Sequence, residues 1–258
     1  MQKIMLTIAY DGTHYHGWQR QKNAITVQEV LEDALTALLK QPITVHGCSR
    51  TDAGVHAAQF VLHFEAGTAI GMEKLPIALN TFLPRDIRVT EAAIAEESFH
   101  ARFDAAGKTY RYRLTRTVHA DPFTRNYAYH YPYPLQFEPM AHAAASFVGR
   151  HDFAAFAAAG STVTDTVRTM TACTLTDCGA EWVFRITGDG FLYNMVRIMV
   201  GTLLYVGRGK LAAEEIPLLL KGGKRENAGV TVPPEGLCLE AVYYDREKMP
   251  KREILGER

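Results

Sequence analysis

The order in which strand and helix patterns follow one another constrains the fold of this chain most strongly. Alternating apolar residues predict strands, and an apolar stripe at helical spacing predicts a helix. Over the first 106 residues the order is strand, helix, strand, strand, helix, strand. These segments are residues 3–10, a helix that begins at Thr26, then 42–46, 57–65, 72–82 and 87–95. This order is typical of the ferredoxin-like split unit.

The second half repeats that order without a visible repeat of residues. Its segments are a strand at 109–117, a helix at 138–149, strands at 167–177 and 182–187, helices at 191–206 and 212–221, and a closing strand at 237–244. Residues 121–139 hold four prolines and many aromatic residues, and we expect an extended connection there. We predict an α+β fold of two ferredoxin-like βαββαβ units, residues 1–106 and 107–258. Their adjoining antiparallel sheets are expected to form a central cleft.

The charges of the chain balance, with 28 lysines and arginines against 28 acidic residues. Binding to a polyanion would therefore require positive charge gathered on one face. Two basic clusters are present in the sequence. They are Lys108, Arg111, Arg113 and Arg116, and then Lys221, Lys224 and Arg225.

Several classes of protein lack support in the sequence. The four cysteines form no Cys-x-x-Cys pair and the ten histidines show no spacing of metal ligands, so we expect no metal and a reduced, intracellular protein. No P-loop or Gly-x-Gly-x-x-Gly follows a strand, so no nucleotide cofactor is expected. The N-terminus does not read as a signal peptide, and residues 191–206 fall short of the ~20 that span a bilayer. These observations predict a cytoplasmic enzyme or binding protein.

Residues 47–57 carry more chemistry than a connection between two strands requires. Arg50 stands two residues before Asp52, and small residues surround the pair. We expect Gly47, Ala53 and Gly54 to leave room for another molecule, so that Asp52 can face a ligand. The alternative is that Asp52 caps a turn while Arg50 makes a surface ion pair. The residue types alone leave these two interpretations about equal.

The strand around residues 108–114 alternates aromatic and basic side chains. Such a surface suits RNA, because bases stack on rings and phosphates meet guanidinium groups. A plain sheet with aromatics in the core and arginines in solvent is the favoured interpretation for Tyr112, Arg111 and Arg113. Tyr110 stays a candidate for a cleft, because a phenol can line one as easily as a core.

Arg197 stands out in an otherwise apolar helical stripe within residues 191–206. A guanidinium is costly to bury without a carboxylate. Asp52 is a candidate partner, since a neighbouring arginine would lower its pKa and keep it ionised. Alternatively, Arg197 extends to the surface or pairs with another acid.

Two further segments allow two interpretations each. Residues 11–20 are rich in His, Trp and Arg, which suits a grip on RNA or a structural turn anchored by Trp18. Residues 222–225 could contact phosphates, although the favoured interpretation is a flexible segment that follows the end of a helix.

Taken in order, these segments resemble the bacterial TruA family of tRNA pseudouridine synthases nearly from end to end. The resemblance rests on residues 10–12 and 17–21 (YDG, GWQRQ), 50–56 (RTDAGVH), 99–103 (FHARF), 108–112 (KTYRY), 191–197 (FLYNMVR) and 234–237 (PEGL). The set in this order is far more specific than any one of its members. One departure is Ser49, where the family often has glycine.

The resemblance implies a pseudouridine synthase fold and an assignment for each candidate residue. Asp52 matches the catalytic aspartate, Tyr110 the tyrosine that contacts the substrate, and Arg197 the active-site arginine. Arg50 matches the arginine that helps move the target base out of its stack. In the reaction, uracil leaves C1′ of the ribose, rotates, and is rejoined through C5. The sequence is compatible with three roles for Asp52: addition to the sugar, addition to the ring, and abstraction of a proton.

The same resemblance implies the partners. The substrate is the anticodon stem-loop of tRNA, at positions 38–40, the active form is a homodimer, and the reaction needs neither cofactor nor metal. Two other functions compete with this isomerase. A non-catalytic RNA-binding protein on a ferredoxin-like scaffold would have no activity to lose on Asp52→Asn. A carboxylate glycoside hydrolase would need a second positioned acid, and none lies near Asp52 in the sequence.

Overall fold

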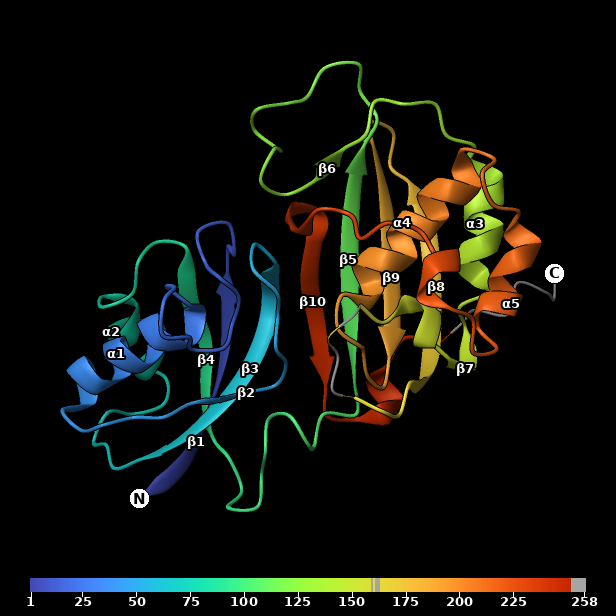
Figure 1. Cartoon of the computed structure of the whole chain (residues 1–258). Coiled ribbons are helices and arrows are strands. Elements are labelled where there is room, and N and C mark those ends of the chain that lie inside the picture. The colour runs from blue at the N-terminus through green and yellow to red at the C-terminus, as the bar shows by residue number, and fades with distance from the viewer. Residues whose placement is uncertain (159, 161–162, 252–258) are drawn as a thin grey trace, which may run out of the picture. The chain divides into compact units, whose positions relative to one another are not determined.

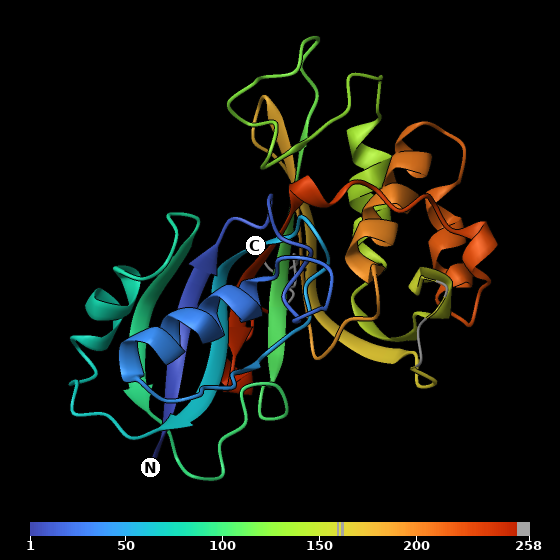
Figure 2. The same ribbon diagram turned by 60° about the vertical axis from the view of Figure 1, so that its left-hand side comes forward.

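The computed structural model describes residues 1–158, 160 and 163–251, and they form two compact units. The first unit is Met1–Ala106 together with Cys238–Tyr244, and the second is Gly107–Leu237 together with residues 245–251. Each unit has a mostly antiparallel sheet with helices packed against it (Figures 1 and 2). The predicted α+β class is confirmed. No helix within these described residues is long and apolar enough to cross a membrane.

The first unit has the predicted element order. Its elements are β1 (Gln2–Tyr10), α1 (Val27–Leu39), β2 (His46–Gly47), β3 (His56–Ala66), α2 (Leu75–Asn80) and β4 (Ile87–Ile94). Strand β1 lies between β4 and β3 and is antiparallel to both. Apolar residues face one another across β1 and β3, and all are at most 1% exposed: Ile4 with Phe64, Leu6 with Leu62, and Ile8 with Phe60. These cross-strand pairs form the centre of the unit's core.

Helix α1 begins where the sequence predicts. Thr26 is its N-cap, and the Thr26 hydroxyl accepts a hydrogen bond from the backbone N–H of Glu29 (3.4 Å). Val27, Leu31 and Leu35 are fully buried along one stripe of the helix. Helix α2 is shorter than predicted, since it begins at Leu75 with Pro76 in its first turn, a position where proline fits well.

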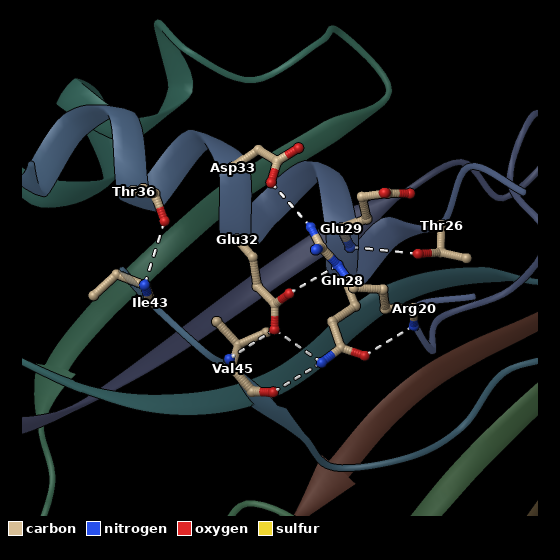
Figure 3. Close-up of polar contacts among 9 residues, drawn as sticks. All are labelled: Arg20, Thr26, Gln28, Glu29, Glu32, Asp33, Thr36, Ile43 and Val45. Atoms are coloured by element: carbon tan, nitrogen blue, oxygen red, sulfur yellow. Dashed lines mark hydrogen bonds and ion pairs between the residues drawn. The ribbon is translucent and has the colours of Figure 1, made fainter. Parts of the chain in front are cut away.

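The strand predicted over residues 42–46 is confirmed only at His46, because α1 side chains bind the backbone of Ile43 and Val45 (Figure 3). Buried Glu32 accepts from the Val45 N–H (3.1 Å), and the Gln28 amide donates to the Val45 carbonyl (3.2 Å). The Thr36 hydroxyl accepts from the Ile43 N–H (3.3 Å). These side chains take the place of a sheet partner, so strand pairing is limited to β2.

The second unit has an antiparallel sheet in the order β5-β9-β8-β7, with β6 parallel to β5. The elements are β5 (Gly107–Thr115), β6 (Tyr129–His130), α3 (Phe137–Ala145), β7 (Gly149–Asp152), β8 (Val167–Asp177), β9 (Glu181–Gly188), α4 (Met195–Gly207) and α5 (Ile216–Leu219). The short β6 and β7 were not predicted, because two to four residues are too few for a period to show. Helix α4 begins four residues later than predicted, since Asn194 is left-handed (φ 58°).

The closing strand, β10 (Leu237–Tyr243), differs from the prediction in its place. The sequence order put it in the second unit, yet residues 238–244 lie with the first. Cys238 pairs with His56 and Leu239 with Ala57, in a parallel register along β3. A parallel neighbour needs a long crossover connection, and residues 67–236, from α2 through the sheet of the second unit, supply it.

Candidate functional site

Asp52 lies half-buried in the loop between β2 and β3. The Val55 N–H donates to the Asp52 carbonyl oxygen (3.2 Å) and closes a tight turn. Gly54 within that turn has φ +76°, a conformation that glycine adopts without strain. Arg50, two residues earlier, is exposed. The loop therefore keeps Asp52 and Arg50 close along the chain on a sharply turned backbone.

A second loop, residues 11–18, holds the Asp52 loop on both sides of the aspartate. On one side, the Trp18 N–H donates to the Thr51 carbonyl (3.1 Å), and the Thr51 hydroxyl bonds to the Tyr10 hydroxyl (2.8 Å). On the other side, the Gly54 N–H donates to the Tyr15 carbonyl (3.1 Å). The backbone is thus fixed by hydrogen bonds at Thr51 before Asp52 and at Gly54 after it.

Glycines let the two loops approach backbone to backbone. A Cβ on Gly12 would overlap the Val55 carbonyl, and one on Gly17 would lie 2.5 Å from the Thr51 carbonyl oxygen. A Cβ on Gly47 would meet the rings of Trp18 and Phe60 at 2.6–2.7 Å. The prediction that Gly47 leaves room for another molecule is therefore wrong, because the protein's own aromatic rings fill that space.

His56 ties the start of the second loop to β3. Its Nδ1 accepts from the Gly12 N–H (3.0 Å) and lies 3.1 Å from a carboxylate oxygen of Asp11. The Asp11 carboxylate also accepts from the N–H of Thr13 (2.9 Å) and from its hydroxyl (2.5 Å).

The loop at residues 11–20 is a structural turn, as one of its two interpretations predicts. Trp18 is 3% exposed and stacks on Phe60 with ring centroids 4.1 Å apart. Arg20 pairs with Glu32 (3.2 Å) and Asp33 (3.0 Å) of α1, as Figure 3 shows.

In the second unit, Tyr110 and Arg197 are linked by the segment that leads into α4. Tyr110 on β5 is 6% exposed, and its ring meets the ring of Phe191 edge to face, 4.9 Å between centroids. The half-buried Arg197 follows in the first turn of α4. Its Nη1 donates to the side-chain oxygen of Asn194 (2.8 Å), and its Nε donates to the Val232 carbonyl (2.7 Å).

Residues 229–233, here called the strap, cross α4 and hold the arginine in place (Figure 1). A Cβ on Gly201 would overlap the Val230 carbonyl, and one on Gly229 would overlap the backbone of Gly201. The Gly229 N–H donates to the Thr202 hydroxyl (2.9 Å). The backbones of α4 and the strap therefore touch directly at Gly201 and Gly229, as only residues without a side chain allow.

The strap also holds Tyr112. The Tyr112 hydroxyl donates to the Pro233 carbonyl (2.8 Å), next to the carbonyl that binds Arg197. Burial raises the pKa of Tyr112, the Glu235 carboxylate raises that pKa further, and the Arg197 guanidinium opposes them. Tyr112 is 1% exposed, so its predicted place in the core is confirmed.

Two arginines of the first basic cluster have acidic partners on the neighbouring hairpin. Arg113 binds Glu181 through two hydrogen bonds (2.8 and 2.6 Å). Arg116 lies 3.7 Å from the centroid of the Trp182 ring and 3.7 Å from a carboxylate oxygen of Asp177. The hydrogen bond from the Gly179 N–H (2.8 Å) and the charge of Arg116 lower the pKa of Asp177.

The structure thus brings the candidates together in two groups. Arg50 and Asp52 share one loop of the first unit, and Tyr110 and Arg197 are joined through residues 191–197 of the second. Sequence reasoning missed the strap and the brace formed by Tyr10 and Thr51. Gly201 was the available signal, since a glycine inside an apolar helix often has a packing reason. In the described part of the chain, no three His, Cys, Asp or Glu side chains could hold a metal ion.

Comparison with known proteins identifies the class of protein. The chain matches the family described as tRNA pseudouridine synthase over residues 6–104 and 143–245. It is 48% identical over 244 residues to tRNA pseudouridine synthase A of Thermoanaerobacter sp. (strain X514), covering 95% of this chain and 100% of that protein. The enzymes of the same name from Acetivibrio thermocellus (46%; 95% and 100% covered) and Bacillus subtilis (47%; 94% and 99% covered) are similarly close.

These matches show that the chain is an RNA-modifying isomerase. The chain belongs to the tRNA pseudouridine synthase family.

Proposed function

We propose that this protein converts uridine to pseudouridine in the anticodon stem-loop of tRNA, at positions 38–40. The observation that carries the proposal is the match over nearly the whole chain to enzymes named tRNA pseudouridine synthase A. The braced loop around Asp52 supports it, because a reacting carboxylate must be held in a fixed position.

Asp52 is the catalytic residue in this proposal. The N1–C1′ bond of the target uridine breaks, the uracil rotates, a C5–C1′ bond forms, and the proton on C5 is released. Loss of the base builds positive charge on the sugar, which a carboxylate can stabilise or attack. A carboxylate can also add to the ring or take up the C5 proton, so the proposal assigns Asp52 the reaction without choosing among these steps.

Each unit contributes to the reaction in this proposal. Tyr110 stacks on the flipped uracil and helps remove the C5 proton. Arg197 supplies positive charge that keeps Asp52 ionised. Arg50 helps to move the target base out of its stack. The role of Arg197 is supported by the fixed orientation of its guanidinium, which Asn194 and Val232 set.

We also propose that the active form is a homodimer in the cytoplasm. The chain carries no net charge, so two copies that combine their basic surfaces would bind tRNA better than one. Sedimentation of the protein with and without tRNA tests this point. Tight tRNA binding by a strictly monomeric protein, with the clusters around residues 108–116 and 221–225 neutralised, would contradict it.

The function is tested with tRNA whose uridines carry tritium at C5. The protein should release tritium in proportion to the pseudouridine formed, and mapping should place the new pseudouridines in the anticodon stem-loop. Release from other regions of the tRNA would show a different specificity. Absence of any release, with tRNA bound, would favour a non-catalytic RNA-binding protein.

A further inference from the structure

The second basic cluster lies beside a surface pocket that the proposed reaction does not use. The pocket has a volume of about 470 Å³ and lies wholly within the second unit. Its walls are Tyr205 near the end of α4 and the segment from Lys224 to Val230 that precedes the strap. Its lining includes two cations and a single acid, Glu226.

One cation of the pocket is held rigidly and another is exposed. The Arg225 guanidinium donates to the Gly229 carbonyl (2.8 Å) and to the Thr231 hydroxyl (3.3 Å). The Lys224 side chain is 80% exposed, and its contact with Glu226 is long (3.8 Å). Such an exposed pair contributes little energy, so Lys224 can turn to an anion at small cost.

Tyr205 of α4 adds an aromatic ring to the pocket, and Lys210, which is not part of the pocket lining, places a third cation near that ring. The Lys210 ammonium lies 5.4 Å from the centroid of the Tyr205 ring. Val230, 52% exposed, adds apolar surface next to these charges. Fixed and mobile cations around a ring and an apolar patch match the parts of a nucleotide, which has a phosphate, a sugar and a flat base.

We infer that this pocket, lined by Tyr205, Lys224, Arg225 and Val230, binds a nucleotide of the tRNA backbone away from the reacting uridine. The inference rests on the proposed function, since it takes tRNA as the ligand. It also gives a chain without net charge a defined cationic contact for RNA. Of the two basic clusters, this one borders a pocket, whereas Arg113 and Arg116 of the other face acids on the neighbouring hairpin.

The test measures binding of unmodified tRNA to the full-length protein at several salt concentrations. The double variant Lys210→Glu with Lys224→Glu should raise the Kd for tRNA at least about tenfold and reduce the salt dependence of log Kd by about two. Its KM for tRNA should rise with the Kd. Glu226→Gln should act in the opposite direction and lower the Kd about twofold.

The double variant Lys248→Glu with Lys251→Glu is the matched control, because both are exposed lysines of the same unit outside the pocket. It should bind tRNA with a smaller change than the double variant Lys210→Glu with Lys224→Glu. If the Kd for tRNA is unchanged both in the double variant Lys210→Glu with Lys224→Glu and in Glu226→Gln, while the wild type releases tritium, the inference that this pocket binds tRNA is overturned. Absence of tritium release by the wild type would instead overturn the proposed function, whatever the pocket binds.

Discussion

The loop of Asp52 and the segment of Arg197 are braced in different ways. Each is crossed by a second stretch of chain at glycines, Gly12 and Gly17 in the first unit, Gly201 and Gly229 in the second. The first brace holds the backbone on either side of Asp52, whereas the strap binds the guanidinium of Arg197 itself. The first brace therefore sets where the aspartate lies, and the second sets how the arginine is oriented.

The largest expected effect is that of Gly201→Ala on the strap. In an exposed helix this change would stabilise the protein by about 1 kcal/mol. Here the new methyl group would overlap the Val230 carbonyl, so we expect a net loss of about 3 kcal/mol in the free energy of unfolding. Urea unfolding measures it, with Gly67→Ala as control, because nothing lies within 4 Å of a Cβ there. A stabilised Gly201→Ala protein would contradict the glycine crossing.

A smaller effect is expected when the orientation of Arg197 alone is loosened. Asn194→Gly keeps the left-handed backbone and removes the hydrogen bond to Nη1. We expect kcat to fall about tenfold, while the KM for tRNA and the unfolding temperature change little. An equal rise in KM with kcat retained would show that Asn194 serves RNA binding and not the orientation of the arginine.

The brace of the first unit should respond differently to the loss of one hydrogen bond. Tyr10→Phe removes the hydroxyl that bonds to Thr51, and we expect a loss of about 1 kcal/mol in the free energy of unfolding. Because this brace acts on the backbone, kcat should fall only a few-fold. Tyr133→Phe, at a side chain 58% exposed, is the control and should change neither quantity. A large loss of kcat without loss of stability would make the two braces alike.

The smallest expected effect uses pH to act on the first unit alone. His63 is buried and accepts a hydrogen bond from the Ala101 N–H (3.1 Å). Burial, His46, His100 and Lys3 lower its pKa to about 4, against a smaller opposing effect of Asp104. Between pH 7 and 6 this histidine therefore takes up about half a proton in the unfolded chain and almost none in the folded chain. The first unit should lose about 0.7 kcal/mol of stability over that range.

Amide hydrogen exchange of β3 and of α4 measures this pH effect in each unit. Protection of β3 should fall on acidification more than that of α4, and His63→Gln should remove the difference. Equal loss in both units, or loss that persists in His63→Gln, would assign the effect to other groups.

The sequence predicted correctly the elements whose pattern extends over many consecutive residues. The alternation in β1, β3 and β8, and the Thr26 cap with its apolar stripe, depend on neighbouring residues alone. The predictions that failed concern segments whose partners are distant in the sequence. Residues 42–46 read as a strand, and only the fold brings Glu32 and Gln28 of α1 against their backbone. The pairing of β10 with β3 depends on residues about 180 positions apart.

The candidate site shows the same limit. Asp52, Arg50, Tyr110 and Arg197 could be selected from residue types and resemblance, because their chemistry is visible in the sequence. Their supports could not, since the strap, Thr51 and Tyr10 act through backbone carbonyls and one hydroxyl pair. Gly47 was misread because Trp18, which fills the space beside it, lies 29 residues earlier.

The central claim, that Asp52 carries the reaction, is tested most directly by single-turnover release of tritium from C5-labelled tRNA. Asp52→Asn keeps the size of the side chain and removes its charge, so the account predicts tRNA binding close to that of the wild type and release slowed at least about a thousandfold. Release within tenfold of the wild-type rate, by an Asp52→Asn protein that binds tRNA normally, would contradict the assignment.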